Sequence, residues 1–108
     1  MAETLLTRQH DGQTIAAAVG SVVVVTLDES PTTGYSWAPL AADETLALVG
    51  SDFALPAQAG VGGSGQRTLR FEVRQRGKHP LQLVLVRPWE GKAGAVDRFS
   101  VTVQATAG

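Results

Sequence analysis

The sequence is organised around residues 30–37, which read SPTTGYSW. Residues 22–27 (VVVVTL) come before this segment, and their β-branched apolar side chains are typical of a buried strand. Inside the segment one proline fixes a backbone angle and one glycine permits conformations that other residues resist. Tyr35 and Trp37 follow two residues apart, so they lie on the same side of an extended strand. We therefore predict a stiff, exposed loop between two strands, where binding residues are often found.

An ordinary tight turn explains the composition of residues 30–37 more simply than a binding loop does. Its function therefore depends on the rest of the chain, in which apolar and polar residues alternate with a period of two. The clearest case is residues 66–76, in which Leu69, Phe71 and Val73 alternate with polar residues. About seven short strands with regular turn signals predict a single-domain, all-β, immunoglobulin-like antiparallel β-sandwich over residues 1–108.

Individual strands are expected near residues 4–8, 14–19, 22–27, 35–38, 45–53, 66–76, 81–86 and 96–103. Residues 22–27 are apolar on both faces and are placed centrally, whereas Pro39 ends its strand or confines it to an edge. Residues 76–80 are predicted to form a hairpin turn with a positive φ at Gly77. Residues 40–48 have some helical character, which is clearest at residues 41–44 and would amount to one turn. Ala105–Gly108 are expected to fray.

Composition excludes several classes of function. The chain has no cysteine, so it forms no disulfide, thiolate metal site or cysteine nucleophile. A net charge of −1 argues against a nucleic-acid or anionic-membrane surface, and no apolar run is long enough to span a bilayer. Residues 1–8 lack the features of a signal peptide. This leaves the localisation open between a cytoplasmic protein and an exported protein whose leader has been removed.

Other motifs do not predict a catalyst or a metal site. Residues 60–65 (GVGGSG) satisfy the dinucleotide-binding pattern GxGxxG, but a strand follows them where that fingerprint needs a helix. A flexible hairpin loop is the simplest interpretation, with a glycine-rich binding loop as the alternative. His10 and His79 are too few for a metal site, and no nucleophile elbow accompanies them. We therefore expect no enzyme activity, no metal and no cofactor.

Arg87-Pro88-Trp89 follows a strongly apolar strand directly. Tryptophan and arginine are enriched among the residues that dominate binding energy at interfaces. Trp89 is therefore either an interface anchor or a loop residue folded back over the core, and the local sequence favours neither.

Three loops, taken together, resemble those of the chagasin family of cysteine-protease inhibitors. Its members carry an NPTTGY-like loop, a GxGG loop and an RPW-like loop in that order. Counting strand reversals along an immunoglobulin-like sandwich predicts that these three loops lie at the same end. The matching residues are Ser30, Pro31, Thr32, Thr33, Gly34, Tyr35, Gly60, Val61, Gly62, Gly63, Arg87, Pro88 and Trp89. The chain departs from the family at Ser30, where asparagine is usual.

This resemblance implies a tight, reversible, non-covalent inhibitor of papain-like cysteine proteases of the papain and cathepsin L class. The three loops would occlude the active-site cleft, with Thr32 nearest the catalytic cysteine, Trp89 beside the cleft and Gly62-Gly63 on the other side. The expected inhibitor is a monomer that binds neither nucleic acid nor a membrane. The alternative is an immunoglobulin-like adhesion or carbohydrate-binding module in which the three loops are incidental.

Overall fold

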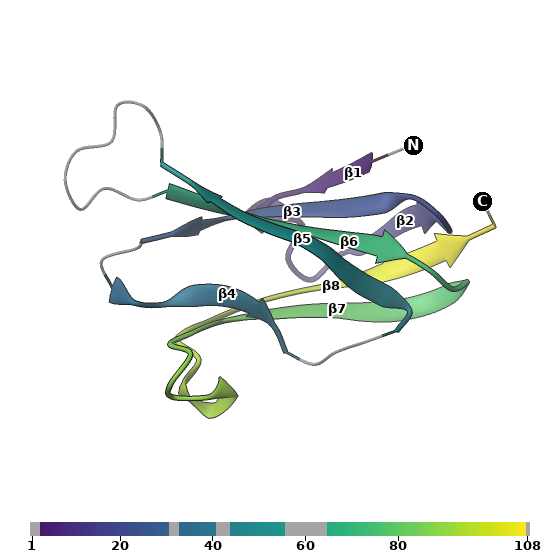
Figure 1. The fold of residues 1–108 in the computed structure, drawn as a ribbon. Helices are drawn as coiled ribbons and strands as arrows, with labels where there is room; N and C mark the ends of the chain where they lie inside the picture. Colours follow the sequence, from purple (N-terminus) through teal and green to yellow (C-terminus); the bar gives the residue numbers. More distant parts are fainter. Residues whose placement is uncertain (1–2, 31–32, 41–43, 56–64, 108) are drawn as a thin grey trace.

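The computed structural model describes residues 3–30, 33–40, 44–55 and 65–107, and strands dominate these ranges (Figure 1). The strands are β1 (Glu3–Leu6), β2 (Thr14–Ala18), β3 (Val22–Glu29), β4 (Ser36–Pro39), β5 (Leu46–Ala54), β6 (Gly65–Val73), β7 (Gly77–Val86) and β8 (Asp97–Thr106). The short 3₁₀ helices η1 (Arg8–His10) and η3 (Lys92–Gly94) lie in connections. Within the described ranges no helix has the length and apolar character needed to cross a membrane.

The described strands form two four-stranded sheets, with the orders β1-β3-β6-β5 and β2-β8-β7-β4. The sheets face each other as a sandwich (Figure 1), which confirms the predicted fold class. The described residues contain eight strands, in agreement with the expected number of about seven. The structure differs from the prediction in one detail, because the β1–β3 and β2–β8 pairs are parallel. Each parallel pair joins an N-terminal strand to a strand reached by a long connection, so no tight hairpin imposes an antiparallel direction.

Alternating side chains of both sheets fill the space between them. Leu69, Phe71 and Val73 of β6 are buried as their spacing predicts, and the opposite sheet contributes Phe99, Val101 and Val103 of β8 in the same way. Burying each large apolar side chain stabilises the fold by about 1.5–3 kcal/mol. The placement of β3 inside its sheet, and of β4 with Pro39 at an edge, is also confirmed.

The structure corrects two expectations near the C-terminal end of β8. Residues 76–80 do not form a hairpin turn, because β6 and β7 belong to different sheets and the connection crosses between them. Gly77 does have a positive φ of 114°. It pairs with Ala105, which is buried and also pairs with Ala17 of β2. Fraying from residue 105 is therefore wrong, since β8 has a partner on each side as far as Ala105. The predicted helical turn falls mainly on residues 41–43, outside the described residues.

Strand register brings the flanks of the three singled-out loops to one end of the sandwich. β3 ends where β6 begins, with Glu29 opposite Gly65. β4 begins where β7 ends, with Ser36 opposite Val86, and β8 begins opposite the penultimate residue of β7. The shared end predicted by counting strand reversals is confirmed for these flanks.

Candidate functional site

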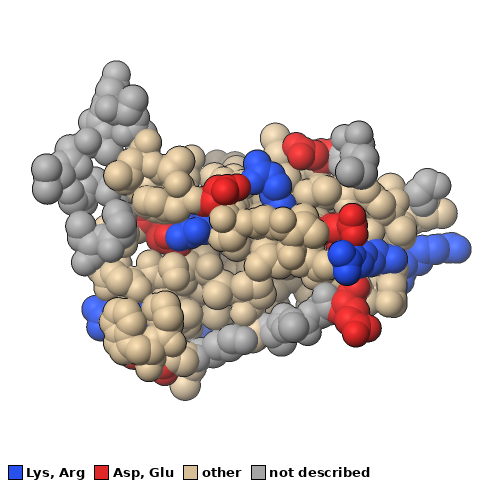
Figure 2. Space-filling model, viewed as in Figure 1, with Lys and Arg blue, Asp and Glu red and all other residues tan. Residues whose placement is uncertain are grey.

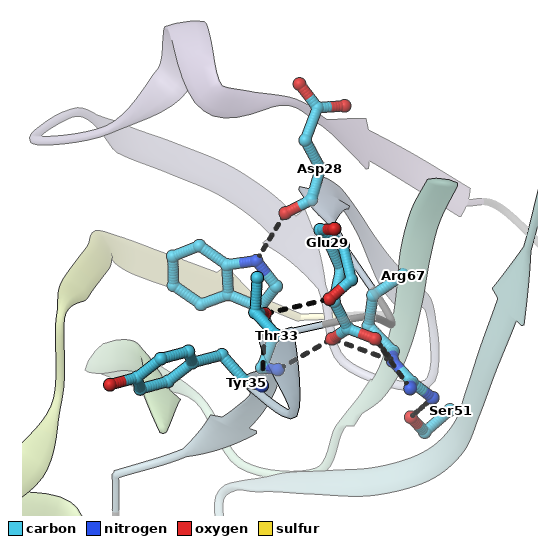
Figure 3. A network of polar contacts seen from close by, with 8 residues as sticks. Asp28, Glu29, Thr33, Tyr35, Ser51 and Arg67 are labelled. Carbon is cyan, nitrogen blue, oxygen red and sulfur yellow. Dashed lines mark hydrogen bonds and ion pairs between the residues drawn. The ribbon is translucent and has the colours of Figure 1, made fainter. Parts of the chain in front are cut away.

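Thr33 shapes the loop between β3 and β4 from within. Its hydroxyl donates to the carbonyl oxygen of Ser30 at 2.9 Å and accepts from the backbone N–H of Tyr35 at 3.3 Å (Figure 3). A longer backbone bond of 3.4 Å joins the Thr33 N–H to the same carbonyl. These bonds fix the turn that ends at Tyr35. Pro31 and Thr32 lie outside the described residues.

Arg87 joins this loop to the loop that follows β7. Its Nε donates to the carbonyl oxygen of Thr33 at 3.2 Å, and its guanidinium carbon lies 4.4 Å from the centre of the Tyr35 ring. The same carbon is 6.0 Å from the Trp89 ring, and Nη1 forms a 3.2 Å ion pair with Glu90. A cation over an aromatic face contributes about 0.5–2 kcal/mol. Arg87 therefore makes one unit of two loops that lie 54 residues apart in sequence.

Trp89 is exposed over 72% of its surface, so it does not fold back over the core. Its ring passes beside Gly34, where a β-carbon would lie 3.0 Å from Cη2 of the indole. Gly34 also has a φ of 77°, a conformation that side-chain-bearing residues rarely adopt. Glycine at this position thus permits both the turn and the close approach of Trp89, which presents a large apolar surface at the loop end.

Trp37 closes the base of the first loop. Its indole is buried, its backbone N–H donates to a Glu29 carboxylate oxygen at 2.8 Å, and its Nε1 donates to the Asp28 carbonyl oxygen at 2.9 Å. Glu29 also forms a 2.8 Å ion pair with Arg67 of β6 (Figure 3). The sequence analysis missed Glu29 and Arg67. The sequence does contain a signal for Glu29. It occupies an inward-facing position of β3, and all the preceding inward-facing residues of that strand are apolar.

The second loop connects the antiparallel strands β5 and β6. Ala54 at the end of β5 pairs with Gln66 of β6. At Gly65 a β-carbon would lie 2.5 Å from the Ala54 carbonyl oxygen and from Cζ of Phe53, so the base of the loop requires glycine there. The predicted site residues Gly60–Gly63 lie outside the described residues.

Comparison with known proteins identifies the family. Residues 16–103 match the model of the chagasin family of peptidase inhibitors. The chain is also 30% identical to Chagasin from Trypanosoma cruzi over 105 residues, covering 93% of this chain and 96% of that protein. The chain belongs to the chagasin family. This membership favours inhibition over the adhesion or carbohydrate-binding alternative.

Two solved structures related to this chagasin-family chain have the same fold. The cysteine protease inhibitor EhICP2 from Entamoeba histolytica superposes with a TM-score of 0.79 at 22% identity, over 98% of this chain and 97% of that one. PbICP-C, solved in complex with falcipain-2, superposes with a TM-score of 0.66 at 15% identity, over 98% and 91%. At such low identities the likeness is one of fold.

Within this chagasin-family fold, the described parts of the first and third predicted loops lie together. Thr33, Gly34 and Tyr35 contact or approach Arg87 and Trp89. Pro88, the remaining described residue of the third loop, is exposed between its two neighbours.

The two histidines take part in local backbone contacts. Nδ1 of His10 accepts from the Thr7 N–H at 3.0 Å beside η1, and Nε2 of His79 lies 2.8 Å from the Gln75 carbonyl oxygen. Among the residues that the structure describes, no three His, Asp or Glu side chains gather as metal ligands would. Figure 2 shows acidic and basic side chains interspersed on one face of the sandwich. At the loop end Trp89 presents an exposed aromatic surface.

Proposed function

We propose that this chagasin-family chain inhibits papain-like cysteine proteases reversibly and without a covalent bond, by covering the active-site cleft with its three loops. In this role the chain is a binding protein and not a catalyst. The observation that carries the proposal is the unit formed by Arg87, in which an exposed Trp89 and the turn at Thr33–Tyr35 are held together at one end of the sandwich.

Preorganisation supports this role. A protease inhibitor that is already in its bound shape loses little conformational entropy when it docks. The bonds from Thr33 and Arg87 supply that order before any partner arrives. A standard inhibitor interface buries about 1,200–2,000 Å² in total, an area that three adjacent loops can supply. The target class is supported by EhICP2, a cysteine protease inhibitor, and by PbICP-C, which binds falcipain-2.

Each loop has a distinct role in the proposal. Thr32 is nearest the catalytic cysteine of the protease, and Trp89 packs on apolar surface beside the cleft. Gly62 and Gly63 approach the opposite side, where the lack of side chains lets backbone meet backbone. Thr32, Gly62 and Gly63 lie outside the described residues, so their roles rest on the family resemblance.

The experiment is a titration of papain and a cathepsin L-like protease with the purified protein, using a fluorogenic peptide substrate. We expect inhibition that is complete, competitive with substrate and fully reversed by dilution, with the inhibitor remaining uncleaved. Trypsin, a serine protease, is the control and should keep its activity. Full activity of several papain-like proteases at micromolar inhibitor would contradict the proposal.

A further inference from the structure

We propose that Glu29 is a positioning residue that holds the loop between β3 and β4 in its inhibitory shape. It acts through Trp37 and Arg67 and does not itself contact the protease. This inference rests on the proposed function, since the loop that it positions is the one placed nearest the protease's catalytic cysteine.

Glu29 is the last residue of β3, and only 5% of its surface is exposed. Both oxygens of its carboxylate accept hydrogen bonds. One oxygen accepts from the Trp37 backbone N–H at 2.8 Å, and the other accepts from Nη2 of Arg67 at 2.8 Å. Nε of Arg67 lies 3.2 Å from both oxygens. The carboxylate thus ties the residue before the loop to the residue after it.

The need for such a tie follows from the topology. β5–β6 and β7–β8 are paired strands, so backbone ladders close the loops between them. In the described part of the chain β3 and β4 lie in different sheets, and no ladder joins them. Side chains must therefore close the base of their loop. Glu29 does so from the first sheet and Trp37 from the second.

Arg67 is itself held in place. Its Nη1 donates to the Ser51 hydroxyl of β5 at 3.2 Å, and its guanidinium carbon lies 5.4 Å from the centre of the Phe53 ring. The contacts therefore run from Trp37 in one sheet, through Glu29 and Arg67, to β5 in the other (Figure 3). The loop base is braced against three strands.

Stability alone does not explain an acid at this position. Burying an ion pair removes two charges from water, and well-packed apolar replacements are often neutral or stabilising. Val23, Val25 and Leu27 occupy the preceding inward positions of β3, so an apolar residue at position 29 would continue the core. What apolar side chains cannot supply is an acceptor for the Trp37 N–H.

The test separates inhibition from stability by replacing both partners. Glu29→Leu combined with Arg67→Leu should lower the melting temperature only modestly, because removal of the buried ion pair offsets part of the loss from the unpaired Trp37 N–H. The same variant should raise the inhibition constant for papain at least about tenfold, mainly through faster dissociation. Hydrogen exchange at the Trp37 amide should accelerate. The matched control is Arg70→Gln, which removes an exposed ion pair between β6 and Asp52 of β5 and should change none of these quantities.

Milder variants keep the test decisive if the double variant does not fold. Glu29→Gln retains an oxygen for the Trp37 N–H and should inhibit more strongly than Glu29→Leu, a rescue that a purely electrostatic contribution to stability would not produce. A folded double variant with unchanged inhibition constant would overturn the inference. If the unmodified protein inhibits no papain-like protease, the proposed function fails instead. Trp37 amide exchange then decides whether Glu29 orders the loop, and unchanged protection in the variants would refute it.

Discussion

The loop between β3 and β4 and the loop between β7 and β8 lie side by side but are built in opposite ways. The first crosses from one sheet to the other, and side chains close its base around Trp37, which is 5% exposed. The second connects paired strands, so a backbone ladder closes its base and leaves Trp89 72% exposed. Where backbone hydrogen bonds close the base of a loop, its large side chain can remain exposed on the surface. Where the loop crosses between sheets, a large side chain must be buried to close the base.

The largest expected effect tests the supporting half of this comparison. Trp37→Ala should destabilise the protein by about 3–5 kcal/mol, because it leaves a cavity in the core and removes the indole bond to Asp28. Urea denaturation followed by circular dichroism measures the loss. A change below about 1 kcal/mol would mean that the crossing loop does not depend on Trp37.

Trp89→Ala tests the exposed half. It should weaken binding to papain by about 2–4 kcal/mol, as truncation of a central interface residue does. Its effect on unfolding should stay within about 0.5 kcal/mol, since the side chain is largely in solvent. Inhibition constants and denaturation midpoints give the two values. Leu5→Ala, which truncates a similarly exposed apolar side chain on β1, is the control and should alter neither. A large loss of stability would instead assign Trp89 to the core.

Arg87→Lys addresses the junction of the two loops and should have the smallest effect. Lysine keeps a positive charge near Glu90 but lacks the planar group that stacks on Tyr35 and the Nε–H that reaches Thr33. Binding should weaken by about 1 kcal/mol, with stability nearly unchanged. Surface plasmon resonance with inactivated papain measures this, with Arg98→Lys as the control. Equal affinities for the Arg87 variant and the unmodified protein would show that the loops are independent.

Strand content and inward faces could be predicted from the sequence because both are local. Every second residue of β6 from Leu69 to Val73 is buried, as the alternation of apolar residues implies. Pairing partners could not be predicted in the same way. The turn signal at residues 76–80 specifies a change of direction, but it does not say which sheet the next strand joins, so a crossing was mistaken for a hairpin. The parallel neighbours of β3 and β8 escaped prediction for the same reason.

The candidate site was likewise predictable from the sequence only in part. The family motifs supplied the loop residues, and counting strand reversals placed their flanks at one end. The support beneath them was not predictable, because a glutamate at the end of an apolar strand is normally exposed, and only the folded chain shows that Arg67 pairs with it. Arg87 was expected to be a protease contact. Its bond to Thr33 shows a second use that no local pattern encodes, because the two residues meet only in the folded chain.

The bond from Arg87 to Thr33 constrains how such an inhibitor can be retargeted. Exchanging the first or the third loop alone would leave an arginine without its acceptor or a tryptophan against a foreign turn. These two segments should therefore be transplanted, and should diversify, as a pair. The β5–β6 connection leaves from its own ladder at Ala54 and Gln66, so it is the place where new protease preferences can be introduced one loop at a time.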